Sequence, residues 1–207
     1  MKQRSKKVEI SVFLLIMLFY VIPPLFVFKA GQSLFSWNFP YASVLIALPF
    51  TFILYFFYEK NEKPFIINYL LFLPQLGIIL AFSFLLKFAS VYFKLGTEHS
   101  ILLPFGVFEW FCCLLQFFAA AFYEEVLYRF YLPEQLLNFT KSKALGFIFE
   151  IISLLFFAFA HLYLGVFSVI NAAFAHIVLR FCFKKNGCIG SLIASHFLYN
   201  VISLILL

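Results

Sequence analysis

The chain has 207 residues, of which 65% are hydrophobic and only 12% are charged, and 34 are phenylalanine. A soluble domain of this size is about half apolar and about a quarter charged, so an ordinary soluble protein is excluded. Long apolar runs recur throughout and predict an all-α, polytopic transmembrane helical bundle whose partner is the lipid bilayer. The net charge of +6 reflects membrane orientation, and we expect no nucleic-acid partner.

About seven helices are predicted from the apolar runs. These runs cover approximately residues 10–28, 41–58, 65–88, 102–123, 144–164, 166–183 and 189–207. The first run follows basic residues, as in a signal peptide, but it is long and no small-x-small cleavage site follows it. We therefore expect a retained first helix, which Pro23-Pro24 kinks or breaks near its far end.

Lys and Arg are distributed unequally between the two ends of the predicted helices. Four precede the first run, two lie between the second and third, three between the fourth and fifth, and three near the sixth-to-seventh turn. The opposite side has the remaining three of the 15. This asymmetry predicts a cytoplasmic N-terminus and a C-terminus outside. We expect an integral membrane protein of a bacterial cell membrane.

Two adjacent carboxylates and an arginine follow directly on the fourth run, at Glu124, Glu125 and Arg129. A carboxylate in or beside a membrane segment costs roughly 2.5–3.5 kcal/mol, so these acids are expected to be paired, hydrated or functional. Glu125 and Arg129 are four residues apart with the acid first, which predicts an ion pair that holds Glu125. Glu124 is rotated by about 100° from Glu125 and is free to face another helix.

The depth of these residues indicates which of them meet. The fourth and fifth runs predict an antiparallel hairpin, and Glu124 and His161 lie equally far, about 18 residues, from its centre near Ser142-Lys143. His196 lies only about nine residues past the predicted turn at 184–187. It reaches the level of Glu124 and His161 only if the hairpin of the fourth and fifth runs protrudes beyond the membrane surface. His196 and Asn200 share one helix face.

A carboxylate beside a histidine can take a proton from a bound water, and imidazole and amide N–H groups can stabilise an oxyanion. This chemistry predicts hydrolysis of an amide bond, without an apparent covalent nucleophile. The candidate catalytic residues are Glu124, His161, His196 and Asn200, and the supporting residues are Glu125 and Arg129. We expect no cofactor; HExxH is absent, although two histidines and two glutamates could still hold a zinc ion.

The motifs resemble those of the CPBP family of intramembrane proteases, the relatives of the type II CAAX prenyl endopeptidase, also called the Abi family. Its EExxxR, FxxxH and HxxxN motifs match residues 124–129, 157–161 and 196–200, within a resemblance that covers about residues 104–207. The resemblance implies a glutamate-type endopeptidase whose site opens to the cytoplasm. It assigns water activation to Glu124 with His161, and the oxyanion hole to His196 with Asn200.

One departure from the family pattern is Phe130, where glycine is common after the arginine. The chain is expected to form a single membrane domain, 1–207, in which 1–100 supply N-terminal helices and 104–207 supply the catalytic core. The resemblance implies a peptide or membrane-protein substrate.

Two other functions remain open. The chain could be a non-catalytic membrane adaptor or bacteriocin-immunity protein that binds a peptide in the same cavity. A proton-coupled transporter using Glu124 and His161 as a relay is a further alternative, which the absence of a visible inverted repeat disfavours. His176, in the sixth run, matches no motif and is expected to bridge helices.

Overall fold

The computed structural model describes residues 6–26, 37–57, 65–93, 102–139 and 142–206. Every regular element within these ranges is helical, which confirms the all-α prediction. The connections between the second, third and fourth predicted runs lie partly outside the described residues, at 58–64 and 94–101. The α-helices are α1 (Lys6–Ile16), α2 (Leu48–Phe57), α3 (Tyr69–Tyr92), α4 (Gly106–Glu124), α5 (Leu132–Asn138), α6 (Lys143–Phe159), α7 (Val166–Asn186) and α8 (Ile189–Leu206).

Five shorter segments of other helical types complete the elements. They are η1 (Met17–Val21), η2 (Pro23–Phe26), η3 (Ser43–Ala47), η4 (Glu125–Tyr131) and η5 (Leu162–Leu164). The 3₁₀ segment η2 starts at Pro23, in agreement with the predicted break of the first helix. Five of the helical stretches are long and apolar enough to cross a membrane, and Ser43–Phe56 is a shorter apolar helix.

The longest of these stretches is Gly106–Asn138, in which α4, η4 and α5 follow one another without a break. Counted with it as one helix, the described residues form seven helices, as the sequence predicts. The apolar run predicts an end near residue 123, but the helix continues because its polar residues find partners inside the bundle. Arg129 pairs with Glu125, and Glu134 pairs with Arg180.

Local sequence signals set the ends of several helices. Asn68 and Ser142 are N-caps whose side chains accept hydrogen bonds from the backbone N–H groups of Leu70 and Leu145. Gly187 ends α7 in the left-handed conformation, with φ of 69°, which glycine adopts without steric cost.

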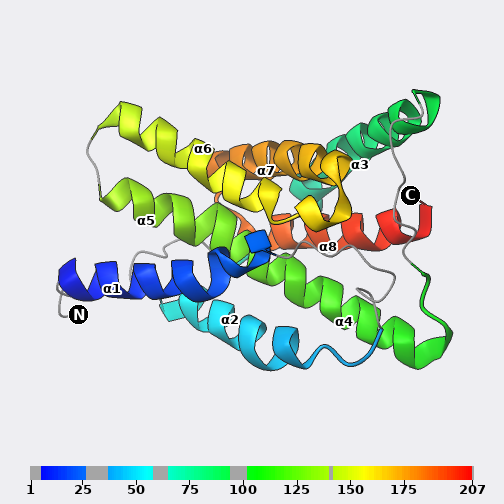
Figure 1. Cartoon of the computed structure of the whole chain (residues 1–207), viewed down its shortest axis with the longest axis horizontal. Helices are drawn as coiled ribbons and strands as arrows, with labels where there is room; N and C mark the ends of the chain where they lie inside the picture. The colour runs from blue at the N-terminus through cyan, green and yellow to red at the C-terminus, as the bar shows by residue number, and fades with distance from the viewer. Residues whose placement is uncertain (1–5, 27–36, 58–64, 94–101, 140–141, 207) are drawn as a thin grey trace.

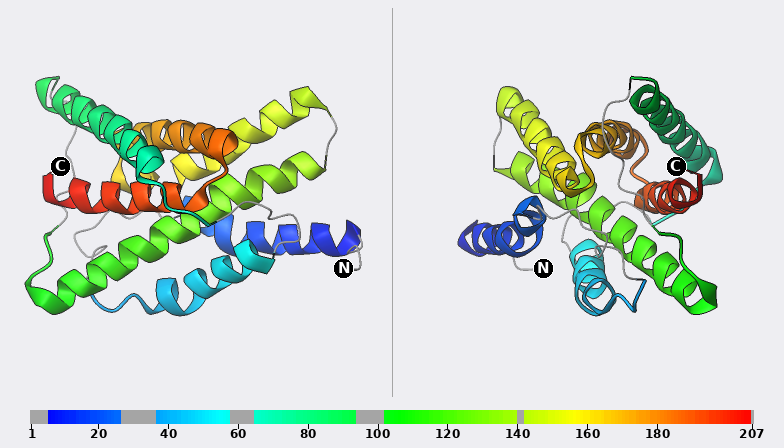
Figure 2. Two further views of the ribbon diagram at one scale, coloured as in Figure 1. Left: turned by 180° about the vertical axis from the view of Figure 1, so that it is seen from behind. Right: turned by 45° about the vertical axis from the view of Figure 1, so that its right-hand side comes forward.

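The facing ends of α5 and α6 lie beyond the connection between α7 and α8 along the long axis of the bundle (Figures 1 and 2). This offset is the one that the sequence requires for Glu124 and His196 to reach a common level. The two-residue connection Gly187–Cys188 is short, so α7 and α8 turn back early while the α5–α6 hairpin extends further.

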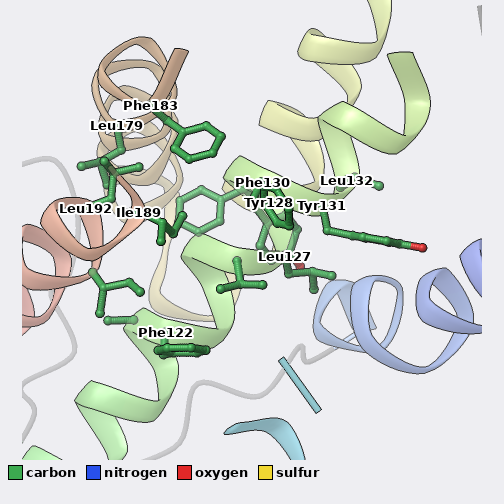
Figure 3. Packing of buried hydrophobic residues seen from close by; sticks show 14 of the residues in the cluster. Phe122, Leu127, Tyr128, Phe130, Tyr131, Leu132, Leu179, Phe183, Ile189 and Leu192 are labelled. Atoms are coloured by element: carbon green, nitrogen blue, oxygen red, sulfur yellow. The ribbon is translucent and has the colours of Figure 1, made fainter. Parts of the chain in front are cut away.

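The apolar core is centred on η4, where every residue from Glu125 to Tyr131 is buried. Leu127, Tyr128 and Phe130 pack there together with side chains of α7 and α8, such as Phe183 and Leu192 (Figure 3). The segment that carries Glu125 and Arg129 is therefore enclosed on all sides by helices and is held by close packing.

A polar triangle joins α3, α7 and α8 elsewhere in the bundle. Ser83 Oγ donates to Asn171 Oδ1 at 2.7 Å, and Asn171 Nδ2 donates to Tyr199 Oη at 2.5 Å. Ser83 Oγ and Tyr199 Oη are 2.9 Å apart, and because the Ser83 hydrogen is already used, the Tyr199 hydroxyl donates to Ser83. The three groups thus satisfy one another.

Candidate active site

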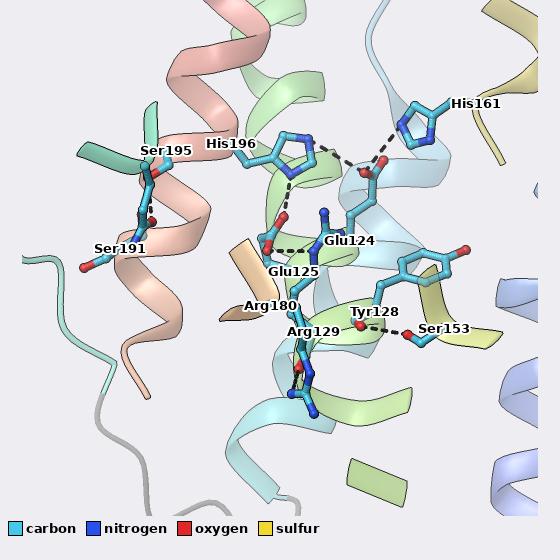
Figure 4. Close-up of polar contacts among 11 residues, drawn as sticks. Glu124, Glu125, Tyr128, Arg129, Ser153, His161, Arg180, Ser191, Ser195 and His196 are labelled. Carbon is cyan, nitrogen blue, oxygen red and sulfur yellow. Dashed lines mark hydrogen bonds and ion pairs between the residues drawn. The ribbon is translucent and has the colours of Figure 1, made fainter. Parts of the chain in front are cut away.

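Glu125 is the fully buried acid of the adjacent pair and is the first residue of η4. Its Oε1 lies 2.7 Å from Nδ1 of His196, and its Oε2 lies 3.3 Å from Nε of Arg129 (Figure 4). Neither the Glu125 nor the Arg129 side chain is exposed. The expected ion pair is therefore present, and His196 joins it as a third member that the sequence reasoning did not place there.

Glu124, the last residue of α4, points toward two histidines: His161, in the turn that follows α6, and His196 of α8 (Figure 4). Its Oε2 lies 3.9 Å from Nε2 of His161 and 3.7 Å from Nε2 of His196. The expectation that Glu124 faces His161 at one level is confirmed by this contact. The side chains of Glu124 and His161 are each 21% exposed, so the centre is partly open, whereas the neighbouring Glu125–Arg129 pair is closed.

The hydrogen bonds on the far side of each ring fix which nitrogen faces Glu124. Nδ1 of His161 lies 2.9 Å from the carbonyl oxygen of Phe157, which can only accept, so Nδ1 carries a hydrogen. Nδ1 of His196 donates in the same way to the Glu125 carboxylate, whose negative charge is stabilised by Arg129. These assignments rest on the hydrogen-bond network. Both rings therefore direct Nε2 at the same carboxylate oxygen.

Distances of 3.7 and 3.9 Å are too long for direct hydrogen bonds and suit groups that are bridged by a water molecule. Without an additional proton, the Glu124 oxygen and the two Nε2 atoms are all acceptors. A donor between them, or a proton on one ring, relieves this conflict. A water molecule bound between these groups would be within reach of one carboxylate and two imidazoles.

Phe157, the aromatic residue of the FxxxH motif, has a position that explains its place in the motif. The guanidinium carbon of Arg129 lies 3.7 Å from the centroid of the Phe157 ring, a cation–π contact. The same ring packs against the His161 ring, with centroids 4.7 Å apart. Phe157 thus contacts a supporting residue and a candidate catalytic residue, a role that the motif alone did not reveal.

Asn200 lies one helical turn beyond His196 on α8 and is partly buried. The helix therefore carries the two side chains on the same side, as the spacing predicts. Among the predicted site residues, direct contacts join Glu124, Glu125, Arg129 and both histidines. Asn200 is linked to this group by its position one turn from His196 on the same face of α8.

Phe130 replaces the glycine that the resemblance leads one to expect, and its ring fills space in the core. It packs against Tyr55 with ring centroids 5.3 Å apart, and against Phe183 at 6.2 Å. Phe130 thus packs between η4, α2 and α7, while the contacts of the acid pair are made by other residues.

His176 of α7 is expected to bridge helices, and in the part of the chain that the structure describes its ring does contact a second helix, α6, but without a hydrogen bond. The side chain is 2% exposed, and both ring nitrogens are without a hydrogen-bond partner there. The ring packs instead against Phe157, with centroids 5.5 Å apart. A buried polar ring without partners costs stability.

Replacement of His176 by leucine is expected to stabilise the protein by about 1–3 kcal/mol, because it removes unpaired polar atoms from the core. The measurement is the midpoint of thermal unfolding in detergent. Asn171→Leu on the same helix is the matched control, because it removes a side chain whose hydrogen bonds are satisfied, and it is expected to destabilise. A loss of stability in His176→Leu as large as in the control contradicts the prediction.

Within the described residues, no group of three or more His, Cys, Asp or Glu side chains is arranged to hold a metal ion. The four cysteines are Cys112, Cys113, Cys182 and Cys188, and they are free. The expectation of a site without a cofactor stays a prediction.

Residues 106–202 match the family model described as type II CAAX prenyl endopeptidase Rce1-like. The match covers all three motifs and so includes every candidate site residue. No curated protein and no solved structure matches the chain.

Proposed function

This chain belongs, through residues 106–202, to the Rce1-like family of type II CAAX prenyl endopeptidases, and we propose that it is an intramembrane endopeptidase of the glutamate type. Its substrate is a peptide or a membrane protein, and its site opens to the cytoplasm. The observation that carries this proposal is the convergence of two imidazole Nε2 atoms on one carboxylate oxygen of Glu124.

The first chemical step is activation of water by Glu124 and His161. A water molecule between them donates one hydrogen to the Glu124 carboxylate and the other to the free Nε2 of His161, which leaves its lone pair free to attack. As the water attacks the scissile carbonyl carbon, Glu124 takes the proton. The Phe157 carbonyl holds the His161 ring in the required tautomer.

Charge balance suggests the role of His196. Two carboxylates at Glu124 and Glu125 face one permanent cation at Arg129, and a second positive charge on His196 makes the cluster neutral. Buried charges need such compensation, and the Glu125 oxygen lies 2.7 Å from Nδ1 of His196. Doubly protonated His196 then has an Nε2–H to donate.

The oxyanion that forms when water attacks receives hydrogen bonds from Nε2–H of His196 and the side-chain amide of Asn200, one turn apart on α8. Collapse of the tetrahedral intermediate breaks the C–N bond, and protonated Glu124 returns its proton to the leaving amine. The products are a carboxylic acid and an amine, and Glu124 is again ionised.

The test is a comparison of the membrane peptidome of cells that produce the wild-type chain with that of cells that produce Glu124→Gln. Peptides whose ends appear only with the wild type identify cleavage. A membrane adaptor or immunity protein of the same fold predicts equal peptidomes and a phenotype that survives the substitution, and this result would contradict the proposal.

Chelation is expected to leave the rate of cleavage unchanged within about twofold, because the proposed base is the Glu124 carboxylate and no step needs a metal-bound water. The measurement is the initial rate of the purified enzyme with and without EDTA or 1,10-phenanthroline, with a zinc protease treated in parallel as the control. Loss of activity with chelator and recovery with added zinc would instead establish the zinc-dependent version of the protease.

A further inference from the structure

The long helix Gly106–Asn138 changes its hydrogen-bond pattern at the acid pair. From Glu125 to Tyr131 it is a π-helix, and the N–H of Leu132 donates to the carbonyl of Leu127, five residues back. The next residue is Pro133, which has no N–H to donate. Pro133 lies where the π pattern of η4 gives way to the α pattern of α5, so it can supply a donor neither to the Tyr128 carbonyl, its partner in the π pattern, nor to the Arg129 carbonyl, its partner in the α pattern.

Both of these carbonyls receive side-chain donors from other helices. Ser153 of α6 donates from Oγ to the carbonyl of Tyr128 at 3.1 Å, and Arg180 of α7 donates from Nη1 to the carbonyl of Arg129 at 2.6 Å (Figure 4). The missing proline donor is thus replaced by groups that lie 25 and 51 residues away in the chain.

Arg180 is itself held in a fixed orientation. Its Nε and Nη2 donate to the two oxygens of Glu150 at 2.9 and 2.7 Å, a bidentate pair with α6. Nη1, which serves the Arg129 carbonyl, also reaches Glu134 of α5 at 3.3 Å. The side chain is only 6% exposed, so water competes weakly for these contacts.

The π-helical segment decides where the acids point. It contains about one more residue per turn than an α-helix, and conversion to the α pattern rotates the residues before it by about 100° relative to those after it. Glu124 immediately precedes the segment, and α5, which follows it, packs on α6. A lost π-turn therefore turns Glu124 away from His161 and His196.

We propose that Arg180 is a positioning residue for the reaction: by donating to the Arg129 carbonyl while Glu150 holds it, it anchors η4 to α7 and α6 and so holds in place the π-helical segment that aims Glu124 at the two histidines. Within the described residues, the Arg180 side chain forms no hydrogen bond or ion pair with Glu124, His161 or His196. This inference rests on the proposed peptidase function for its kinetic effect, and on the structure alone for its effect on η4.

The first experiment compares Arg180→Met with Lys184→Met. Lys184 is on the same helix, carries the same charge and contacts the same acid, Glu150, at 3.4 Å, but it is 58% exposed and forms no hydrogen bond or ion pair with η4 within the described residues. Arg180→Met is expected to lower kcat by about 10²-fold, the effect of a misplacement of about 1 Å, with KM within about twofold. Lys184→Met is expected to keep both constants. Equal kcat values for the two variants would overturn the role.

If Arg180→Met does not accumulate in membranes, Arg180→Lys is measured in its place. Lysine keeps the charge near Glu150, but its single ammonium group cannot hold the bidentate pair and serve the carbonyl in the same geometry. A fall in kcat by about tenfold or more at unchanged KM is expected, and wild-type kcat would contradict the proposal.

The charge swap Glu150→Arg/Arg180→Glu separates positioning from stability. It restores an ion pair between α6 and α7 but places an acceptor where the Arg129 carbonyl needs a donor. We expect protein levels to recover relative to either single variant, while kcat stays low. Recovery of kcat together with protein level would show that the ion pair alone is sufficient, and would overturn the positioning role.

Amide hydrogen exchange tests the same contact without any substrate. In Arg180→Met, exchange is expected to rise in peptides that cover residues 125–134 and to stay unchanged in α3, whereas Lys184→Met leaves both unchanged. This readout holds even if the wild type cleaves no peptide, so failure of the proposed function and failure of this inference are distinguishable. Unchanged exchange across η4 in Arg180→Met would overturn it.

Discussion

The variant Glu124→Gln is expected to lower kcat by about 10³-fold while the protein accumulates normally, because an amide has the shape of the carboxylate but cannot accept the proton of the attacking water. Glu124 is partly exposed and its Oε2 makes no direct hydrogen bond among the described residues, so the substitution leaves the fold intact. The measurement is single-turnover cleavage in proteoliposomes, with a peptide found by the peptidome comparison.

Glu109→Gln is the matched control for this result. Glu109 is on the same helix, α4, but its carboxylate accepts a hydrogen bond from the backbone N–H of Phe105 at the helix start. Its replacement is expected to change kcat by less than about twofold, since it takes no part in proton transfer. If Glu124→Gln keeps more than about a tenth of the wild-type rate, Glu124 is not the base.

The second large effect is expected in Arg129→Met, which should destabilise the protein by about 3–5 kcal/mol because it leaves the buried carboxylate of Glu125 without its permanent cation. Both side chains are fully buried, so neither water nor salt can take the place of the arginine. The cation–π contact with Phe157 is lost as well. The measurement is the free energy of unfolding in mixed micelles, together with the protein level in membranes.

The ion pair of Lys184 with Glu150 is the control for the buried Glu125–Arg129 pair, because the Lys184 side chain is exposed. Lys184→Ala should cost no more than about 1 kcal/mol, since an ion pair at the surface contributes little. The double variant Glu125→Gln/Arg129→Met should be more stable than Arg129→Met, because it removes the stranded charge along with its partner. Equal stability of Arg129→Met and Lys184→Ala would show that the buried pair is not the support of η4.

The contacts of the site were predictable to the extent that they follow from residue spacing. The interval of four residues gave the Glu125–Arg129 pair, and equal distances from the hairpin centre gave the contact between Glu124 and His161. His196 lies close to the start of α8, so it can reach the level of Glu124 only if the α5–α6 hairpin extends further than the α7–α8 hairpin. The facing ends of α5 and α6 do lie beyond the α7–α8 connection. Each of these results needs only the fixed rise and rotation of a helix.

Other contacts could not be read from spacing, because they depend on how helices rotate against one another. Nothing local marks Arg180 as the donor to the Arg129 carbonyl, although Pro133 does signal that some carbonyl nearby needs one. His196 contacts both Glu124 and Glu125, and this too could be predicted only if the rotation of α8 about its own axis were known. The missing partners of His176 follow from its packing on Phe157.

The hydrogen bonds among Ser83, Asn171 and Tyr199 affect how the protein adapts to bilayers of different thickness. Hydrocarbon offers no hydrogen bonds, so sliding α8 along α3 and α7 would strand several polar groups at a cost of several kcal/mol each. A mismatch between helix length and lipid thickness costs only a fraction of a kcal/mol per ångström. The three helices are therefore expected to meet a thicker or thinner bilayer by tilting together, which preserves the spacing between Asn200, the neighbour of Tyr199, and the rest of the bundle.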